Sequence, residues 1–522
     1  MVRPLRCAVM VATFLACVST GLATPAPATA SFPRLSSASD SPPLVAVPEP
    51  NAQTFLLVDL PRAWGRGALG TNVTIAVVDT GINVNHLAFG GSGGNYGHLD
   101  FSRKVVGWHD VYGNLSEPAD VAAHGSHVAS IAAGNYTTPD GSPAYWGAAP
   151  SAHLVVVRAF VSVGFKLTAS GERVVSGLDW LASHASEYRL RVASLSFVNK
   201  VGPTNGTDSL SLAVERLVEA GVLVVAAAGN EGPAPGSVKV PAASKSALAV
   251  GFVDAEGTLH PDSSRGPTDD GRQKPEVLAP GVEVTGARAF NNETFYNLTG
   301  SSMAAPIVAG VAALLFQQAP WLSPLEAKAI LAATAWQPHV VGSLVDEATG
   351  YGVVQASAAL DAATKLVPWN ETATGLLTGR VGWELPRVAA WRVRLNEGEA
   401  REYQLVVSPG LRADLHVFGP RPDALGLPTL VATTAGKFLS RCRVVPKETG
   451  DYLFVVKARP GSFDGYFWVG LADDWPVWAF VALATTQVAA CACAAVAATH
   501  GRRHRRGATS RLPSSWPPPT SP

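Results

Sequence analysis

The chain has 522 residues, of which 47% are hydrophobic and only 15% are charged, against about 25% charged in an average soluble protein. This composition excludes a wholly disordered chain, and the length suits two or three domains that each bury their own core. Forty basic and forty acidic residues balance overall, but basic residues gather at the two ends and leave a mildly acidic body. That body offers no electrostatic footprint for nucleic acid, so no nucleic-acid partner is expected.

Residues 1–23 are typical of a signal peptide. Two arginines precede an apolar run over residues 7–18, and small residues follow near Ala23, which is the order found in such peptides. Cleavage after Ala23 or after Ala30 fits this pattern, and a retained anchor helix is the alternative. Residues 24–50 are rich in Pro, Ser and Ala and are predicted to be a linker or short pro-segment, because they hold too little apolar surface to fold.

Residues 51–366 alternate between two patterns. Short continuous apolar runs, typical of strands buried on both faces, lie at 73–78, 153–157, 192–197 and 222–228. Helical patterns lie between and after them, at 171–186, 209–220, 302–318 and 324–335. Alternating strands and helices predict an α/β domain with a parallel sheet covered by helices.

Four short segments of this region carry polar side chains that would meet at one edge of an open parallel sheet, where strand ends and helix starts converge. Asp79 ends the first strand, and His124 opens a helix with His127 three residues later. Asn230 leaves a buried strand, and Ser302 opens a long Ala-rich helix. Taken singly, each has a simpler interpretation as a helix cap, a turn residue or a metal-binding histidine pair.

Taken together and in order, the four segments resemble those of the subtilisin-like serine proteases. They read VVDTG, HGSHVA, AAGNEG and GSSMAAP, against D-T-G, H-G-T-H-V-A, A-A-G-N-E-G and G-T-S-M-A-x-P in that family. The resemblance covers about residues 52–364. It implies a catalytic domain with a parallel sheet and hydrolysis of peptide bonds.

The resemblance also implies a role for each reacting residue. Ser302 would be the nucleophile, His124 the general base and acid, and Asp79 the group that orients the imidazole. Asn230 would donate to the oxyanion together with the Ser302 backbone N–H, whereas His127 has no catalytic role. The chemistry agrees, because a serine hydroxyl needs an adjacent base at neutral pH and a tetrahedral oxyanion needs preorganised donors.

The resemblance also implies that Ser196, Phe197, Val198, Ala227 and Gly229 bind the substrate, with Ser196 to Val198 on a strand that lines the cleft. Val198 stands where the family usually has Gly. A branched side chain there predicts a narrower specificity pocket that favours small or medium apolar residues.

Other departures from the family pattern leave the chemistry intact. Ser301 replaces the usual Thr, and Ile307 replaces the usual His after Pro306, but neither position reacts. A folded pro-domain is not expected, because residues 1–50 are taken up by the signal peptide and the linker. No cofactor is required and no metal ligand is predicted; structural calcium is common in the family, but no acidic loop here names its ligands.

After residue 368 the pattern changes to runs that alternate polar and apolar residues between Gly and Pro turns. The runs lie at 390–395, 402–407, 414–418, 452–457 and 465–471. They predict an antiparallel β-sandwich over residues 375–471. It resembles the small jelly-roll domains that follow secreted peptidases, and a generic immunoglobulin-like spacer is the alternative.

Residues 475–499 contain no charged side chain, and their length suits a bilayer span. Trp475 and Trp478 open this run, and an arginine cluster in the basic, Pro-rich tail at 500–522 closes it, as expected of an interfacial belt and a stop-transfer signal. The sequence thus predicts a single-pass type I membrane protein of the secretory pathway or cell surface, with a cytoplasmic tail. A buried hairpin is the alternative; a lipid-anchor signal and a nuclear signal fit poorly.

Two further signals concern the compartment. Seven Asn-x-Ser/Thr sequons support passage through a glycosylating compartment, although some, such as Asn72 beside an apolar strand, are expected to be buried. The sequons begin at Asn72, Asn114, Asn135, Asn205, Asn292, Asn297 and Asn370. Of the five cysteines only Cys442 falls in the predicted lumenal part, so no intrachain disulfide is expected there.

The sequence therefore favours a membrane-anchored serine endopeptidase that acts on proteins or peptides through an acyl-enzyme. The alternative from another class is a catalytically inactive surface adhesion or scaffold protein on a subtilase fold. A third hypothesis is a peptide ligase or transferase that uses the same triad. No reacting residue is missing from the motifs, which favours the enzyme.

Overall fold

The computed structural model describes residues 51–472, apart from 92–95, 164–165, 200–201, 340–342, 382–384 and 437–438. The predicted signal peptide, the linker, the membrane segment at 475–499 and the tail lie outside the described residues.

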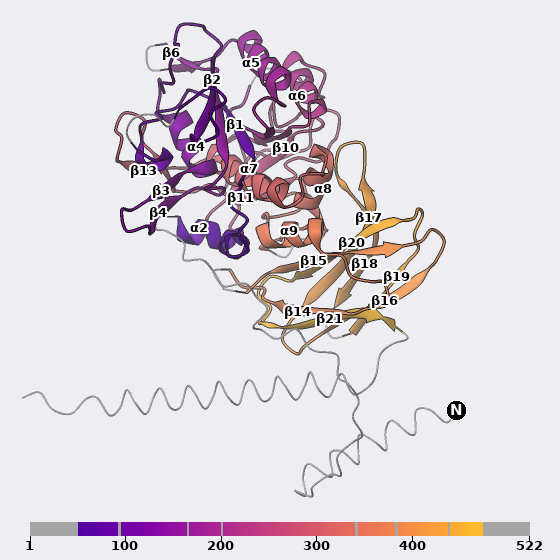
Figure 1. The fold of residues 1–522 in the computed structure, drawn as a ribbon. Helices are drawn as coiled ribbons and strands as arrows, with labels where there is room; N and C mark the ends of the chain where they lie inside the picture. Colours follow the sequence, from indigo (N-terminus) through magenta and orange to yellow (C-terminus); the bar gives the residue numbers. More distant parts are fainter. Residues whose placement is uncertain are drawn as a thin grey trace, which may run out of the picture. The chain divides into compact units, whose positions relative to one another are not determined.

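A seven-stranded sheet forms the centre of the first domain, with strand order β11-β10-β9-β8-β1-β5-β2 and every neighbouring pair parallel (Figure 1). The strands are β1 (Thr74–Asp79), β2 (Val105–Asp110), β5 (His153–Arg158), β8 (Leu190–Leu195), β9 (Leu223–Ala227), β10 (Leu248–Val253) and β11 (Val277–Pro280). The predicted parallel α/β sheet is confirmed.

Helices cover both faces of this sheet because its strands are apolar on both faces. Ile75 and Val77 of β1 join one hydrophobic cluster, and Ala76 and Val78 join the other. The first cluster contains residues of α2 (Ala52–Leu57), α3 (Leu60–Trp64), α4 (His124–Ala133), α7 (Ser301–Gln318), α8 (Pro324–Ala333) and α9 (Ala356–Thr364). The second contains residues of α5 (Gly171–His184) and α6 (Ser209–Glu219).

Helix α7 is apolar all round because it runs through the core. Among the residues that the structure describes, it is the one helix long and apolar enough to cross a membrane, and 83% of it is buried within the protein. Its apolar character is thus explained by packing against the sheet.

Short antiparallel hairpins and one short helix complete this domain. They are η2 (Leu87–Phe89), β3 (Asn135–Thr137) with β4 (Pro143–Trp146), β6 (Val161–Val163) with β7 (Lys166–Thr168), and β12 (Val284–Ala287) with β13 (Phe295–Leu298). The sequence analysis did not predict these hairpins, and it placed the end of one buried strand too late. That strand, β8, ends at Leu195 rather than at 197, so Ser196, Phe197 and Val198 follow the strand.

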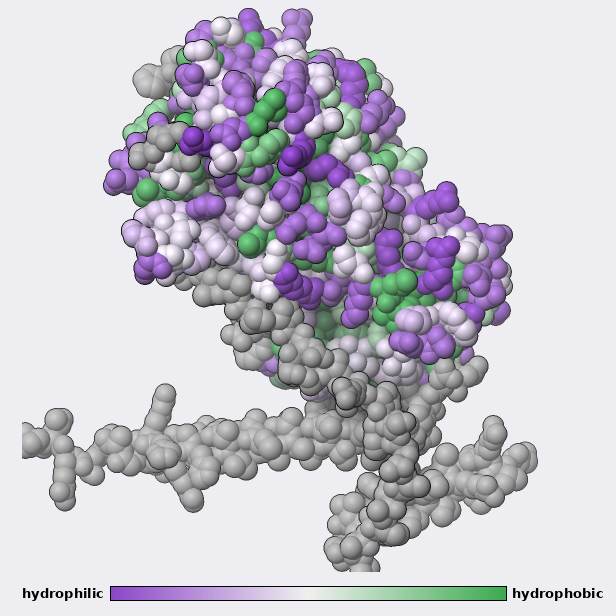
Figure 2. Space-filling view, in the orientation of Figure 1, coloured by the Kyte–Doolittle hydropathy of each residue, from purple (hydrophilic) through white to green (hydrophobic). Residues whose placement is uncertain are grey.

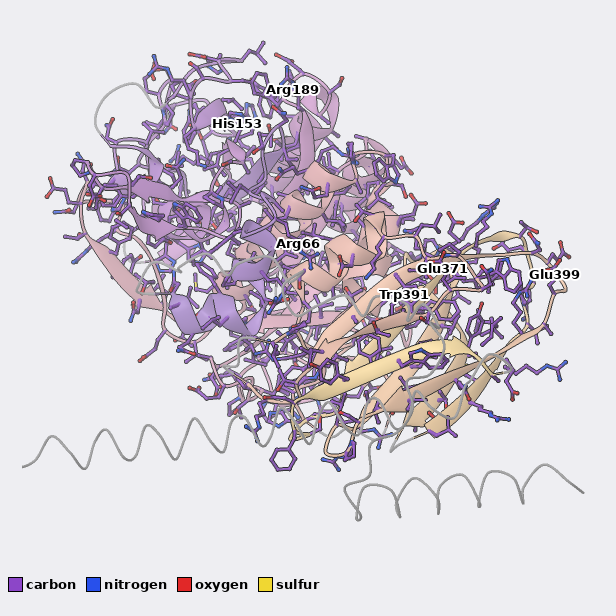
Figure 3. All side chains as sticks on the ribbon, turned by 60° about the horizontal axis from the view of Figure 1, so that its bottom comes forward. Arg66, His153, Arg189, Glu371, Trp391 and Glu399 are labelled. Carbon is purple, nitrogen blue, oxygen red and sulfur yellow. The ribbon has the colours of Figure 1, made fainter. Side chains whose placement is uncertain are left out.

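The C-terminal residues 373–471 form two four-stranded antiparallel sheets, called here the two-sheet module. One sheet is β14 (Ala373–Leu377), β21 (Gly465–Leu471), β16 (Arg401–Val407) and β19 (Leu439–Val444); the other is β15 (Val388–Leu395), β20 (Gly450–Ala458), β17 (Ala413–Pro422) and β18 (Pro428–Gly436). Side chains of both sheets form one cluster that includes Trp391, labelled in Figure 3, and Phe454. The predicted antiparallel strands are therefore present.

The module packs directly on the first domain. Leu453 and Val455 of β20 point away from the module's own cluster and join the core that holds α8 and α9, and α9 lies beside β15 (Figure 1). The Trp336 indole Nε1 donates to the Ala458 carbonyl at 2.8 Å. This arrangement is not that of a spacer joined to the domain only by a linker.

A buried ion cluster lies near this junction. The Glu276 carboxylate is 2.7 Å from Lys274 Nζ and 3.0 Å from Lys328 Nζ, and all three side chains are almost fully buried. Lys328 Nζ also donates to the carbonyl of Leu425 in the module at 2.7 Å. Buried charges persist only when paired and hydrogen-bonded, so this cluster connects the segment just before β11, helix α8 and the module.

On the face drawn in Figure 2, hydrophobic residues are scattered among hydrophilic ones, as expected of a surface in contact with water.

Candidate active site

The side chains singled out in the sequence lie where the carboxyl ends of three neighbouring strands meet. Asp79 is the last residue of β1, Ser196 directly follows β8, and Asn230 comes three residues after β9. His124 and Ser302 lie in the first turns of α4 and α7, two helices that pack against each other. This edge of the sheet is the usual location of binding sites in open α/β folds.

Asp79 and His124 form a hydrogen-bonded pair. The ring nitrogen Nδ1 of His124 lies 2.8 and 2.9 Å from the two carboxylate oxygens of Asp79. A carboxylate only accepts, so Nδ1 must carry the proton, and Nε2 is left to take up a proton from elsewhere. Asp79 is only 2% exposed, and its Oδ1 also accepts from the Thr80 N–H at 2.7 Å.

The surroundings of His124 favour its charged form. Burial acts to lower the pKa of the ring, but attraction and hydrogen bonding by Asp79, together with attraction by Asp120, outweigh burial and raise the pKa above its ordinary value of 6.5. Because a general base must be neutral to accept a proton, this shift moves the working range of His124 to higher pH than that of a free imidazole.

Ser302 is held by the segment that follows β8. Its Oγ donates to the Ser196 carbonyl at 3.0 Å, and the Ser196 Oγ donates to the Ser302 carbonyl at 2.9 Å. Within the described part of the chain no hydrogen bond joins Ser302 to His124. The structure thus pairs Asp79 with His124, whereas the link between base and nucleophile stays a prediction.

The Asn230 side chain has a defined orientation. Its Oδ1 accepts from the Ser301 N–H and from the Ser301 Oγ, each at 2.9 Å. A backbone N–H can only donate, so the amide oxygen must face Ser301 and the amide nitrogen is left to donate on the other side. Gly300, with φ of 150°, permits this approach, because a Cβ there would lie 2.8 Å from the Asn230 amide nitrogen.

Ser301 therefore has a function that sequence reasoning missed. It was treated as a substitution without consequence, but its hydroxyl also accepts from the Gly229 N–H at 3.1 Å while it donates to Asn230. The sequence did contain a signal for this role, because replacing Thr by Ser at position 301 keeps the hydroxyl.

His127 is buried behind the pair. Its Nε2 lies 3.0 Å from the Tyr296 carbonyl, and the two rings are in edge contact, 4.9 Å between centroids. Burial lowers the pKa of His127 to about 4, so the ring is neutral near pH 7. Among the described residues no group of three or more His, Cys, Asp or Glu side chains could hold a metal ion.

Two of the predicted substrate-binding residues, Val198 and Gly229, lie close together. A Cβ on Gly229 would lie 3.5 Å from Cγ1 of Val198 and 2.8 Å from the hydroxyl of Ser264. The branched side chain of Val198 therefore lies next to Gly229. Phe197 packs edge-on against Phe160, with ring centroids 5.1 Å apart.

Ala227 lies deeper than the other predicted cleft residues. It is only 1% exposed and belongs to the hydrophobic core. Any contribution of this residue to substrate binding would come from its backbone.

Comparisons with known proteins identify the family of the chain. Residues 70–352 match the model of the subtilase family. The chain is 32% identical over 291 residues to Serine protease AprX of Bacillus subtilis (strain 168), an alignment that covers 51% of this chain and 62% of the relative. It is 31% identical to Subtilisin DY of Bacillus licheniformis, over 53% of this chain and 89% of the relative. It is 32% identical to Subtilisin Savinase of Lederbergia lenta, over 58% of this chain and 96% of the relative.

The effect of Asp79 on the pKa of His124 can be measured. Following the ring C–H resonances of His124 by NMR against pH should give a pKa above 6.5, and Asp79→Asn should lower it, because the variant loses the negative charge that favours the protonated ring. His127, titrating near pH 4, is the internal control. A His124 pKa that is the same in both proteins would contradict the assigned electrostatic role of Asp79.

Proposed function

The chain belongs to the subtilase family and is a subtilisin-like serine protease, and on this premise we propose that it is an endopeptidase with Asp79, His124 and Ser302 as its catalytic triad. The observation that carries the proposal is the hydrogen bond of 2.8 Å between Asp79 and His124 Nδ1, at a sheet edge that α7 also reaches with Ser302. A Ser-His-Asp triad is recognised by such geometry.

The proposed reaction begins when the Ser302 hydroxyl leaves the Ser196 carbonyl and turns toward His124. In this proposal the movement is a change of the Ser302 side-chain rotamer. His124 Nε2 then takes the hydroxyl proton as Oγ attacks the scissile carbonyl carbon, and Asp79 stabilises the imidazolium that forms. The buried carboxylate keeps its charge throughout.

The tetrahedral oxyanion would be held by the Asn230 amide nitrogen and the Ser302 backbone N–H. Because Ser301 fixes the Asn230 oxygen, the amide nitrogen is already oriented before the substrate arrives, and preorganised donors of this kind stabilise the transition state. Collapse of the intermediate expels the amine, which receives its proton from His124. Water then attacks the acyl-enzyme carbonyl as His124 takes its proton, and His124 returns that proton to Ser302 Oγ as the carboxylic acid product leaves.

Labelling with a fluorophosphonate tests this proposal against an inactive adhesion or scaffold protein. Ser302→Ala should abolish both labelling and peptide hydrolysis, because the hydroxyl that forms the covalent bond is absent. The change should leave the fold intact, since this half-buried hydroxyl makes few contacts.

Ser301→Ala is the matched control, because it removes the neighbouring hydroxyl but keeps the nucleophile. This variant should still be labelled, although more slowly, since Asn230 loses one of its two hydrogen bonds. Labelling that persists in Ser302→Ala would disprove the triad, and a wild-type protein that is never labelled would favour the scaffold.

We also propose that Val198 narrows the specificity pocket beside Gly229. The closeness of these two positions supports this proposal, and Val198 is stiff because it is branched at Cβ. The pocket would then favour small or medium apolar side chains immediately before the cleaved bond.

Val198→Gly should broaden acceptance toward Phe, because it removes the side chain that fills the pocket. One apolar group in a pocket shifts selectivity by about 1–3 kcal/mol, or roughly 10- to 200-fold. The measurement is kcat/KM for matched peptides with Ala, Leu and Phe at that position. An unchanged Phe-to-Ala ratio would show that Val198 does not face the pocket.

For the whole protein we propose an extracellular or lumenal protease, anchored by residues 475–499 as a single C-terminal span. The uncharged run with tryptophans before it and arginines after it supports this topology. Exposed sequons support it as well: Asn72, predicted to be buried, is exposed, as are Asn114, Asn135, Asn292, Asn297 and Asn370, and Asn205 is half-buried. Proteins and peptides would be its substrates.

Truncation before Trp475 tests the anchor. The shortened protein should be secreted in a soluble and active form, because it keeps the described domains and loses the apolar run. The full-length protein should resist extraction with carbonate. Pelleting of the truncated protein with membranes after carbonate treatment would contradict a single C-terminal anchor.

A further inference from the structure

Asp120 lies in the loop that leads into α4, four residues before His124, and its carboxylate is saturated with hydrogen bonds. Its Oδ1 accepts from the Thr80 hydroxyl at 2.7 Å and from the backbone N–H groups of Ala122 and Ala123 at 3.0 and 2.9 Å, and its Oδ2 accepts from the Ser126 N–H and hydroxyl, both at 2.7 Å. Five donors on one carboxylate make its position highly determined.

This carboxylate caps the helix that carries His124. The residue at the N-cap position of α4 is Ala123, which has no side-chain acceptor and adopts a left-handed φ of 65°. The first N–H groups of a helix need an acceptor outside the helix, and Asp120 supplies one from three residues upstream. The Tyr296 hydroxyl, which donates to the Ala123 carbonyl at 3.2 Å, holds the other side of this residue.

The same carboxylate reaches the turn that carries Asp79. Thr80, which donates to Asp120, directly follows Asp79, and its hydroxyl also accepts from the Gly125 N–H at 2.8 Å. The two segments are in backbone contact, because a Cβ on Gly125 would lie 2.1 Å from the Gly81 carbonyl oxygen. Asp120 thus bonds both the turn after β1 and the first turn of α4.

We propose that Asp120 is a positioning residue of the active site, whose carboxylate fixes the start of α4 against the Asp79–Thr80 turn and so holds His124 in reach of Asp79. The inference rests on the proposed function, in which His124 is the base. Asp120 bonds Thr80 and the start of α4, and not the reacting atoms. It therefore acts on the reaction through His124.

The charge of Asp120 acts on His124 as well. Asp79 on β1 and Asp120 in the loop act directly on the charge of His124, and His124 in turn acts on His127 of α4. Tyr296 of β13 contacts the His127 ring and is itself influenced by Asp120, Arg288 and Asp79. Burial lowers the pKa of His124, and the attraction of Asp79 and then of Asp120 raises it. Removing the charge of Asp120 should therefore lower this pKa and extend activity to lower pH, because the base must be neutral to accept a proton.

The test compares Asp120→Asn with Ser126→Ala in the full chain. Asp120→Asn removes the charge and turns an amide N–H toward the donors of Ser126. We expect kcat to fall about 10- to 100-fold with little change in KM, as for a displaced catalytic group, and the acid limb of kcat/KM to move to lower pH. Ser126→Ala removes the hydroxyl that donates to Asp120 and accepts from the Asn83 N–H, but it keeps the charge of Asp120, so its acid limb should not move.

An NMR readout separates this inference from the proposed function. In a Ser302→Ala background, the His124 pKa should fall with Asp120→Asn and stay the same with Ser126→Ala, whether or not the wild-type protein hydrolyses peptides. A wild type without hydrolysis would refute the proposed function alone. An unchanged His124 pKa, an unchanged kcat, or equal losses in both variants without movement of the acid limb would overturn the role of Asp120.

Circular dichroism establishes that each variant is folded. Should Asp120→Asn unfold, Thr80→Val keeps the side-chain shape and removes the hydroxyl that donates to Asp120 and accepts from the Gly125 N–H. This variant should lower kcat without moving the acid limb, and an unchanged kcat would overturn the proposal.

Discussion

The buried carboxylate of Asp79 is the constraint on which the rest of the site depends. An ionised group that is only 2% exposed must have its oxygens hydrogen-bonded, and the donors available at the end of β1 are the Thr80 N–H and His124 Nδ1. Meeting this requirement brings the start of α4 into backbone contact with the turn after β1. Gly125 allows that contact, because any side chain there would collide with the turn.

The partners of each catalytic group are placed so that its reacting atom stays free. Nδ1 of His124 is occupied by Asp79, which leaves Nε2, and the Asn230 oxygen is occupied by Ser301, which leaves the amide nitrogen. Groups bound behind the reacting atoms therefore set tautomer and orientation before any substrate arrives. This preorganisation avoids the cost of reorienting dipoles during the reaction.

Features that depend on neighbouring residues could be predicted from the sequence. Hydrogen bonds between residues far apart in the chain could not. Buried strands such as β1 are continuous apolar runs, and the Ser302 segment is a contiguous motif, so both could be recognised from neighbouring residues. Asp120 and Ser301 act through hydrogen bonds to residues 40 and 71 positions away, and no local pattern records such partners. The exposure of Asn72 was likewise missed: the residue lies before β1, which begins at Thr74, and has a left-handed φ of 62°.

The position of the two-sheet module is also set by side chains that must be buried or paired. Its strand β20 has apolar side chains on both faces, and the second face has to be buried somewhere; Leu453 and Val455 bury it in the core of the α/β domain. Lys328 of α8 reaches across to the Leu425 carbonyl while it pairs with Glu276. Separating the parts would expose apolar surface on both and take an acceptor from a buried ammonium group. The module and the α/β domain therefore share one buried core at this junction.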